Sequence, residues 1–167
     1  LVRELEDALR GPAAMAPGLV SVGSVDALRQ VPFKVVAVLG LNEGDFPRRE
    51  SPPGFDLIAA SPRRGDFRRH ESDRYLFLET LMSAREHVHL SYVGYDRREG
   101  RPLPPSSCVQ QLADFLVHGA YGGERSRFEE ATWFYHPPQP FHEAEFQGTH
   151  LPRSFAAHWL PASQVSA

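Results

Sequence analysis

The sequence predicts an α/β fold in which helices flank a parallel sheet. The first observation is the apolar run Val35–Leu39, which has no polar alternation and is typical of a strand buried on both faces. The second is Glu71–Glu86, where apolar residues recur at helical spacing. The third is His87–Val93, which alternates as a further strand would. A helix between two strands favours parallel pairing of those strands.

Two elements are predicted ahead of the central strand. Leu1–Arg10 carries leucines at helical spacing with acids between them, and Gly11-Pro12 ends this helix. Leu19–Val25 alternates apolar and small polar residues, which suits a short strand. We therefore expect residues 1–18 to form an N-terminal helix and linker.

Turn-forming residues follow the central strand from Gly40 to Pro47. Such residues build a shaped loop at the carboxyl end of a strand, and ligands of open α/β sheets usually bind at that end. Glu43 and Asp45 place two carboxylates in this loop. Two carboxylates alone are a weak signal for a metal, so we interpret the stretch as a turn.

The helix over Glu71–Glu86 is expected to be broadly buried. Tyr75, Leu78 and Met82 fall on one stripe of it, and neighbouring apolar residues widen that stripe. Ahead of this helix, Phe55–Ala60 is predicted to form a short helical turn.

A second long helix is predicted over Ser106–His118, with a serine at its start as the cap. From Glu124 onward, aromatic residues and prolines follow one another without a period. We expect residues 124–167 to be an irregular tail, and residues 19–123 to form the α/β domain.

Composition narrows the class of protein. The 167 residues are 41% hydrophobic and 23% charged with a net charge of −3, which indicates a soluble globular domain without a global basic field. Cys108 is the single cysteine, which excludes an internal disulfide and fits a reducing compartment; we expect a packed, inert thiol. No apolar run approaches the roughly 20 residues of a membrane span, so we expect a cytoplasmic protein. The start at Leu1 in a helical pattern suggests a fragment of a longer protein.

An arginine-rich connection joins the loop to the helix. Its arginines could contact the phosphate backbone of DNA, form ion pairs with a protein partner, or lie on a plain solvated surface, and the residues leave these alternatives open. The six candidates are Arg48, Arg49, Arg63, Arg64, Arg68 and Arg69.

Two strings of residues resemble a known family. VVAVLGLNEGDFP, residues 35–47, resembles the segment after motif V of UvrD-like superfamily 1 helicases, and DRYLFLETLMSAREHVHLSYVG, residues 73–94, resembles their motif VI. The longer run from Pro32 to Ala84 is similar to the RecC family, the gamma subunits of exodeoxyribonuclease V. This resemblance implies a partial RecA-like, P-loop NTPase-type domain, the second motor-type domain of the helicase fold.

Three positions depart from an active motor. Ser83 stands where motif VI of the family has an arginine, so the charge that stabilises phosphoryl transfer is absent. In motif V, Gln30 replaces the family's glycine, and Pro32 replaces its nucleotide-contacting glutamate. The sequence contains no Walker A motif. We therefore expect the frame of a motor without ATP hydrolysis, with no catalytic residue, metal or cofactor in this fragment.

The resemblance implies a function at the level of a complex. It implies a non-catalytic scaffold and DNA-handling subunit of a RecBCD-type helicase–nuclease that processes double-strand DNA ends and recognises Chi for recombinational repair. The implied partners are RecB-type and RecD-type helicase subunits in a heterotrimer, DNA ends and single-stranded DNA, with no membrane. Two alternatives remain open: an active ATP-dependent DNA helicase domain, and a protein-interaction module without DNA contact.

Overall fold

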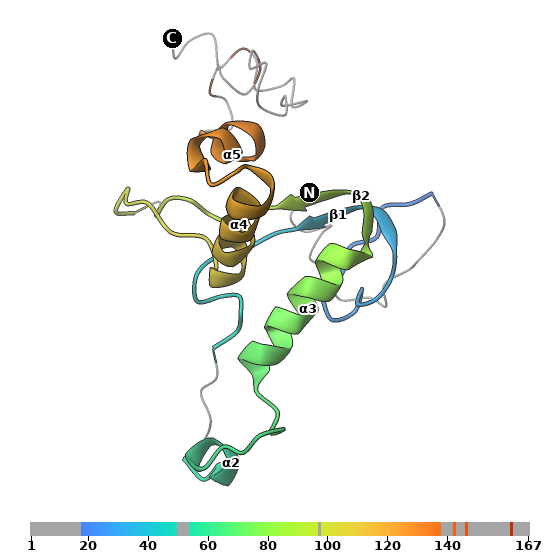
Figure 1. Ribbon diagram of the computed structural model, residues 1–167, viewed down its shortest axis with the longest axis vertical. Helices are drawn as coiled ribbons and strands as arrows, with labels where there is room; N and C mark the ends of the chain where they lie inside the picture. Colours follow the sequence, from blue (N-terminus) through green and yellow to red (C-terminus); the bar gives the residue numbers. More distant parts are fainter. Residues whose placement is uncertain are drawn as a thin grey trace. The chain divides into compact units, whose positions relative to one another are not determined.

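A computed structural model describes residues 18–49, 54–96, 98–137, 142, 146 and 161. They fall into two compact units, one within Leu1–Val93 and Pro104–Val109 and the other within Gly94–Leu103 and Gln110–Ala167. The predicted helix over Leu1–Arg10 lies outside the described residues. The elements in chain order are β1 (Phe33–Val38), α2 (Leu57–Ala60), α3 (Arg69–Ser83), β2 (Ala84–Leu90), α4 (Ser107–Ala120) and α5 (Arg125–Thr132) (Figure 1).

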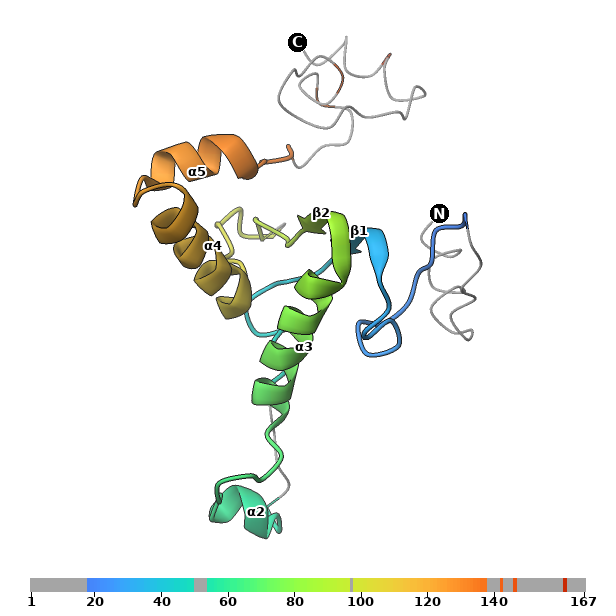
Figure 2. The same ribbon diagram turned by 45° about the vertical axis from the view of Figure 1, so that its right-hand side comes forward.

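The first unit is built around a parallel pair of strands. β1 pairs with β2, with Val36 opposite Val88 and Val38 opposite Leu90. Figure 2 shows the two strands side by side, with α3 leading straight into β2. The mixed α/β class and the parallel pairing are confirmed. The pair is too small to identify a RecA-like sheet, so that part of the fold stays a prediction, as do the domain limits at residues 18 and 123.

The second strand begins earlier than its apolar alternation indicates. α3 ends at Ser83, and Ala84 already has the extended backbone of a strand (φ −73°, ψ 131°). The polar start of β2 is tolerated because it is exposed, and Glu86 forms a cross-strand ion pair of 3.0 Å with Lys34 of β1. Backbone pairing with β1, rather than side-chain alternation, therefore sets where this strand begins.

The expectation that the central strand is buried on both faces is wrong for this chain. Val38 is buried, but Val35 is 56% exposed, and Leu39, just beyond the strand, is 70% exposed. Among the described residues, α3 is the helix that packs against both strands. A sheet covered by a helix on one face leaves apolar residues of its other face exposed.

Leu19–Val25 does not form the predicted strand. Residues 19–24 have no regular structure, and residues 25–30 form turns. The Ser24 carbonyl accepts hydrogen bonds from the backbone N–H groups of Ala27 and Leu28 at 3.0 and 3.1 Å, and the Ser24 hydroxyl also accepts from Ala27. Local serine hydrogen bonds replace a strand ladder here, a competition that alternation alone does not reveal.

The buried face of α3 differs from the predicted one. Asp73, Leu76 and Phe77 are buried, and the Phe77 ring lies 6.1 Å from that of Phe46. The stripe of Tyr75, Leu78 and Met82 that we expected to be buried is exposed. Helical spacing predicted a helix correctly, but both sides of α3 carry apolar residues, so spacing could not identify the side that packs.

The second unit contains most of α4, together with α5. Its core comprises Ala113, Val117 and Phe128, and the Phe128 ring makes an edge contact with Tyr121 at 5.4 Å between ring centroids. Gly123, with φ +87°, donates its N–H to the Val117 carbonyl at 2.8 Å and ends α4.

α5 corrects the expectation of an irregular tail from residue 124. This helix has one buried residue, Phe128, so its sequence carries almost no periodic signal. It is stabilised by packing against Tyr121 and Trp133 rather than by a repeated apolar stripe. Most of the predicted tail beyond residue 137 lies outside the described residues. None of the helices in the described part is long and apolar enough to cross a membrane.

Candidate functional site

The turn that resembles motif V contacts the helix that resembles motif VI. The Gln30 side-chain amide donates to Glu79 Oε1 at 2.9 Å, and Arg29 Nε donates to Glu79 Oε2 at 2.5 Å. The hydrogen bonds from Gln30 and Arg29 hold the pKa of Glu79 below its usual value. The guanidinium of Arg29 also lies over the Tyr75 ring, 5.8 Å from the ring centroid. Two side chains of the turn therefore converge on a single carboxylate of α3.

Gln30 has a backbone conformation that favours glycine. Its φ is +62°, and it is the one non-glycine residue with positive φ in the described part of the chain. The left-handed region favours glycine, which is the residue that the family resemblance places at this position. The turn thus has a glycine-type geometry at residue 30, while the Gln30 side chain bonds to Glu79.

The Ser83 side chain is neutral, so it cannot supply a charge that stabilises a phosphate group. It is the last residue of α3, and its hydroxyl donates to the Thr80 carbonyl at 2.7 Å. Pro32 lies exposed immediately before β1 and has neither a backbone N–H nor a carboxylate. The two positions at which the resemblance places charged ATP-handling groups therefore hold an internally bonded hydroxyl and an inert ring.

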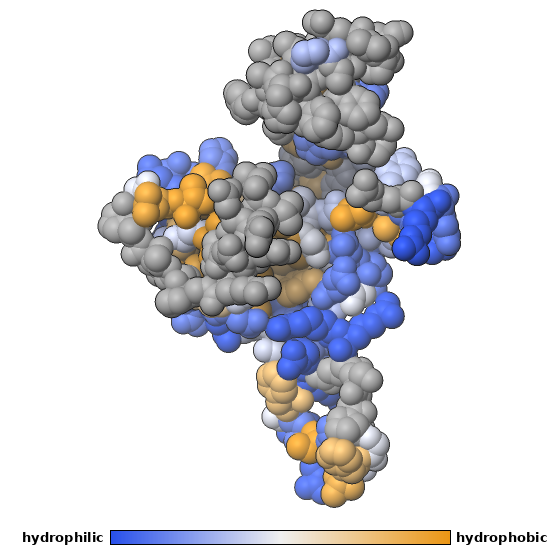
Figure 3. All heavy atoms as spheres, turned by 180° about the vertical axis from the view of Figure 1, so that it is seen from behind, coloured by the Kyte–Doolittle hydropathy of each residue, from blue (hydrophilic) through white to orange (hydrophobic). Residues whose placement is uncertain are grey.

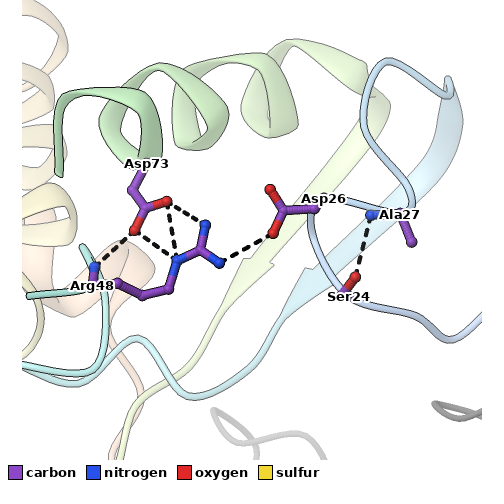
Figure 4. A network of polar contacts seen from close by, with 5 residues as sticks. All are labelled: Ser24, Asp26, Ala27, Arg48 and Asp73. Atoms are coloured by element: carbon purple, nitrogen blue, oxygen red, sulfur yellow. Dashed lines mark hydrogen bonds and ion pairs between the residues drawn. The ribbon is translucent and has the colours of Figure 1, made fainter. Parts of the chain in front are cut away.

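A second carboxylate of α3 is the centre of a larger network (Figure 4). Asp73 is 1% exposed, and both of its oxygens accept hydrogen bonds from Arg48. The Arg48 backbone N–H donates to Oδ2 at 2.8 Å, Nε donates to Oδ2 at 3.0 Å, and Nη2 donates to Oδ1 at 2.5 Å. Nη1 of the same guanidinium reaches Asp26 Oδ2 at 3.3 Å. Arg48, which directly follows the loop over Gly40–Pro47, thereby links this loop to α3 and to the turn that begins at Ser24.

In this network the Asp73 carboxylate and the Arg48 guanidinium each favour the charged form of the other. The hydrogen bond from Arg48 holds the pKa of Asp73 below its ordinary value, against the effect of burial. The hydrogen bond to Asp73 likewise raises the pKa of Arg48. A bidentate guanidinium–carboxylate pair of this kind is strong and geometrically specific. DNA phosphate would have to compete with a buried carboxylate for Arg48.

The other candidate arginines occupy different surroundings. Arg49 Nη2 lies 3.9 Å from Glu43, and Arg68 Nη1 lies 3.7 Å from Glu71; these are loose pairs between exposed side chains. Arg69 adds to the charge that lowers the pKa of Asp73. The described residues record no ion pair for two exposed arginines, Arg63 and Arg64. The arginine-rich connection is therefore not one uniform surface.

The central loop forms the predicted turn. Asn42 organises it: its Nδ2 donates to Asp45 Oδ2 at 3.0 Å, and its Oδ1 accepts the backbone N–H of Val93 at 2.7 Å. The Leu41 backbone N–H donates to Ser91 O at 2.9 Å, so backbone bonding with the second strand's chain continues past β1. The loop's polar groups thus bond within the protein.

Sequence reasoning did not identify the partners of the two acids that organise this region, Asp73 and Glu79. A signal existed for Asp73, because it lies three and four residues before Leu76 and Phe77 and so shares their face of a helix. An acid among apolar residues on one face requires a buried partner. The partner, Arg48, is 25 residues away in sequence, and no local pattern could identify it.

Comparison with known proteins gives one consistent result. No family model matches the chain. The chain is similar to the RecBCD enzyme subunit RecC of Haemophilus influenzae, with 38% identity over 168 residues covering 100% of this chain and 14% of the relative. The Escherichia coli RecC subunit is 37% identical over 87% of this chain and 14% of the relative. The Mycobacterium tuberculosis RecC subunit is 35% identical over 74% of this chain and 11% of the relative. The resemblance to RecC is confirmed, and the chain spans about one seventh of the first two relatives and about one ninth of the third.

Proposed function

We propose that this chain, which is homologous to one segment of the RecC subunits, works as part of a non-catalytic scaffold in a RecBCD-type helicase–nuclease. The enzyme so formed processes double-strand DNA ends, recognises Chi and serves DNA repair and recombination in the cytoplasm. The subunit that carries this segment assembles with RecB-type and RecD-type subunits and handles DNA ends and single-stranded DNA. The motors and the nuclease belong to the complex, and this segment contributes structure.

The observation that carries the proposal is the chemistry of the side chains at positions where the resemblance places motor residues. Ser83 directs its hydroxyl to the Thr80 carbonyl, and Gln30 binds Glu79. An arginine finger accelerates phosphoryl transfer by about 10³- to 10⁵-fold through its charge. A neutral hydroxyl bonded to its own helix supplies none of that charge.

The exposed apolar residues of the sheet support the RecA-like part of the proposal. Val35 and Leu39 come from an unbroken apolar run, yet both are exposed in this chain. In a parallel sheet with helices on both faces, such residues are covered. We place β1 and β2 within a larger RecA-like sheet whose remaining strands come from other parts of a longer polypeptide, about seven times the length of this segment.

The internal networks fit a scaffold. Arg48 and Glu79 each join segments that are distant in sequence through hydrogen bonds within the protein. A motor must let such segments move with its nucleotide state, whereas a scaffold has to hold one arrangement. The turn and α3 are here connected by side chains of the chain itself.

The test is ATP hydrolysis by the intact polypeptide that carries this segment. Purified without partner subunits, it should show no turnover above background. In the assembled enzyme, Ser83→Ala should leave the ATPase rate unchanged, as should the control Ser72→Ala on the same helix. Turnover by the isolated polypeptide that disappears with Ser83→Ala would refute the non-catalytic assignment and favour an active helicase domain.

DNA contact is tested separately by titrating single-stranded DNA at several salt concentrations. Phosphate contacts give an affinity that falls steeply with salt. The change of Arg63, Arg64, Arg68 and Arg69 to alanine should reduce both the affinity and the salt dependence. Unchanged binding would remove these arginines from the DNA surface and favour a role in protein interaction alone.

A further inference from the structure

We propose that residues 24–31, which we call the strap, form one unit that two polar attachments fasten to α3 and that opens from α3 only as a whole. The strap leads through Pro32 into β1, so its closed position fixes where the chain enters the sheet. The inference goes beyond the proposed function and does not rest on it, because a chain with or without ATP hydrolysis could carry such a strap. It rests on contacts that this chain makes with itself.

Backbone hydrogen bonds close the strap on itself. The Ser24 carbonyl accepts the N–H groups of Ala27 and Leu28 at 3.0 and 3.1 Å, and the Leu28 carbonyl accepts the N–H of Val31 at 3.3 Å. The Leu28 side chain also lies against the residue before the strap, since a Cβ added to Gly23 would meet it at 3.3 Å. Successive turns bonded in this way form a contiguous unit that opens cooperatively.

The first attachment joins the later part of the strap to the Glu79 carboxylate of α3. Arg29 Nε donates to one carboxylate oxygen at 2.5 Å, and the Gln30 amide donates to the other at 2.9 Å. The Glu79 side chain is 12% exposed, whereas the Arg29 side chain is 41% exposed. Charge-assisted hydrogen bonds to a carboxylate that is largely shielded from water are stronger than an exposed surface pair. We therefore expect this attachment to be the stronger of the two.

The second attachment acts through Arg48, whose Nη1 lies 3.3 Å from Asp26 Oδ2 in the earlier part of the strap. The same guanidinium donates through Nε and Nη2 to the buried Asp73 of α3, so it is held in position facing the strap (Figure 4). The Asp26 side chain is 59% exposed, which makes this the weaker attachment. The two attachments thus fasten two different points of the strap to the same helix.

The attachments are polar, and apolar burial does not replace them. None of residues 24–31, all of which the structure describes, is buried. Hydrophobic residues gather on a different part of the chain, over α2 at the lower end of Figure 3. A segment without a buried side chain depends on its polar contacts for its position, and salt screens ion pairs between exposed groups. We therefore expect the closed state of the strap to weaken as the ionic strength rises.

The experiment measures hydrogen exchange of the strap amides in the intact polypeptide, resolved to single residues by mass spectrometry and corrected for intrinsic rates. The amides of Ala27, Leu28 and Val31 report opening, because each is hydrogen-bonded in the closed strap. Glu79→Ala should accelerate the exchange of all three by about 10-fold, and Asp26→Ala should do so by about threefold. Because both attachments fasten one unit, the two factors should multiply to about 30-fold in the double variant.

Glu86→Ala is the matched control. It removes an exposed carboxylate of β2 whose ion pair of 3.0 Å is with Lys34, outside the strap, so strap exchange should stay unchanged. The amides of Leu41 and Ser91 donate between the two segments that carry the strands. Their protection should remain that of the unaltered protein in every variant, which distinguishes opening of the strap from a loss of folding.

Salt provides a second measurement, which a role in packing alone would not affect. Raising the ionic strength to about 1 M should accelerate strap exchange in the unaltered polypeptide by up to about fivefold. The double variant should lose this salt dependence, because the ion pairs that salt screens are absent from it.

Three results would overturn the inference. Acceleration confined to Ala27 in Asp26→Ala and to Val31 in Glu79→Ala would show that the strap opens in pieces. Unchanged exchange in both single variants would show that other contacts hold it closed. An equal effect of Glu86→Ala would show that the response is not specific to the two attachments. The ATPase assay is a separate measurement, so each of these results would leave the proposed function standing.

Discussion

Removing the Arg48 side chain should loosen α3 far more than removing its neighbour Arg49. Asp73 is 1% exposed and accepts four hydrogen bonds from Arg48. In Arg48→Ala, the bond from the backbone N–H of residue 48 is the one of these four that is kept. Breaking a buried ion pair by removing one partner costs about 3–5 kcal/mol. Because the Arg48 side chain is 41% exposed and water can enter once it is removed, we expect the lower end, about 3 kcal/mol.

The assay is hydrogen exchange of the α3 amides in the intact polypeptide. A local destabilisation of about 3 kcal/mol should accelerate their exchange roughly 100-fold at pH 7. Arg49→Ala is the matched control, because Arg49 and Glu43 are exposed and 3.9 Å apart. A surface pair of this kind contributes less than about 1 kcal/mol. Equal protection of α3 in the two variants at pH 7 would refute the structural role of Arg48.

The dependence on pH gives an independent check. With Arg48 present, the folded pKa of Asp73 is lowered, so its contribution to stability is present above the unfolded value of about 3.9 and is lost as the pH falls through the folded pKa. Without Arg48, burial should raise the folded pKa of Asp73 above the unfolded value, so the variant should regain stability as the pH falls through that raised pKa. The difference in protection between wild type and Arg48→Ala should therefore narrow between pH 7 and about pH 4. A constant difference over this range would mean that the lost side chain acted through packing and not through its charge.

Three further predictions test other parts of the chain. Gln30→Ala should destabilise the turn by about 1 kcal/mol more than Gln30→Gly, because both variants lose the bond to Glu79 but only alanine bears the cost of a left-handed backbone. The rate of protease cleavage in the turn measures this difference in stability, and equal rates in the two variants would contradict it. Phe128→Ala should cost about 3–5 kcal/mol and release α5, seen as fast amide exchange there, whereas retained protection would show that α5 does not depend on this ring. Burial raises the pKa of Cys108, so its thiol should resist alkylation at pH 8 until the protein is unfolded; rapid labelling of the native protein would contradict this.

Local sequence patterns were sufficient to predict the elements whose own residues produce the pattern. The apolar run after Phe33 predicted β1, helical spacing predicted α3, and the crowding of turn-forming residues after Gly40 predicted the loop. The short helical turn near Leu57 was also predicted correctly. In each case the residues that produce the pattern are those that form the backbone structure, so no distant partner is needed.

Other features depended on contacts that a local pattern does not contain. Leu19–Val25 alternates like a strand but lies in no ladder, because Ser24 bonds to the next turn instead. α5 has one buried side chain, so its helix depends on rings from outside the helix. Strands and short helices are stabilised largely by their neighbours, and those neighbours are identified by tertiary packing.

The sequence by itself predicted a parallel α/β pairing, and it showed that charged groups are lacking at the two positions where the family resemblance places ATP-handling residues. Residue identity is enough for that conclusion, because neither the hydroxyl of Ser83 nor the ring of Pro32 can supply a charge at any geometry. Only the tertiary structure decided which of the remaining charged side chains have partners within the protein. Six arginines look equivalent in the sequence, yet Arg48 bonds to a buried carboxylate 25 residues away, whereas Arg63 and Arg64 are exposed. An ion pair depends on distance and burial in space, and separation along the chain predicts neither.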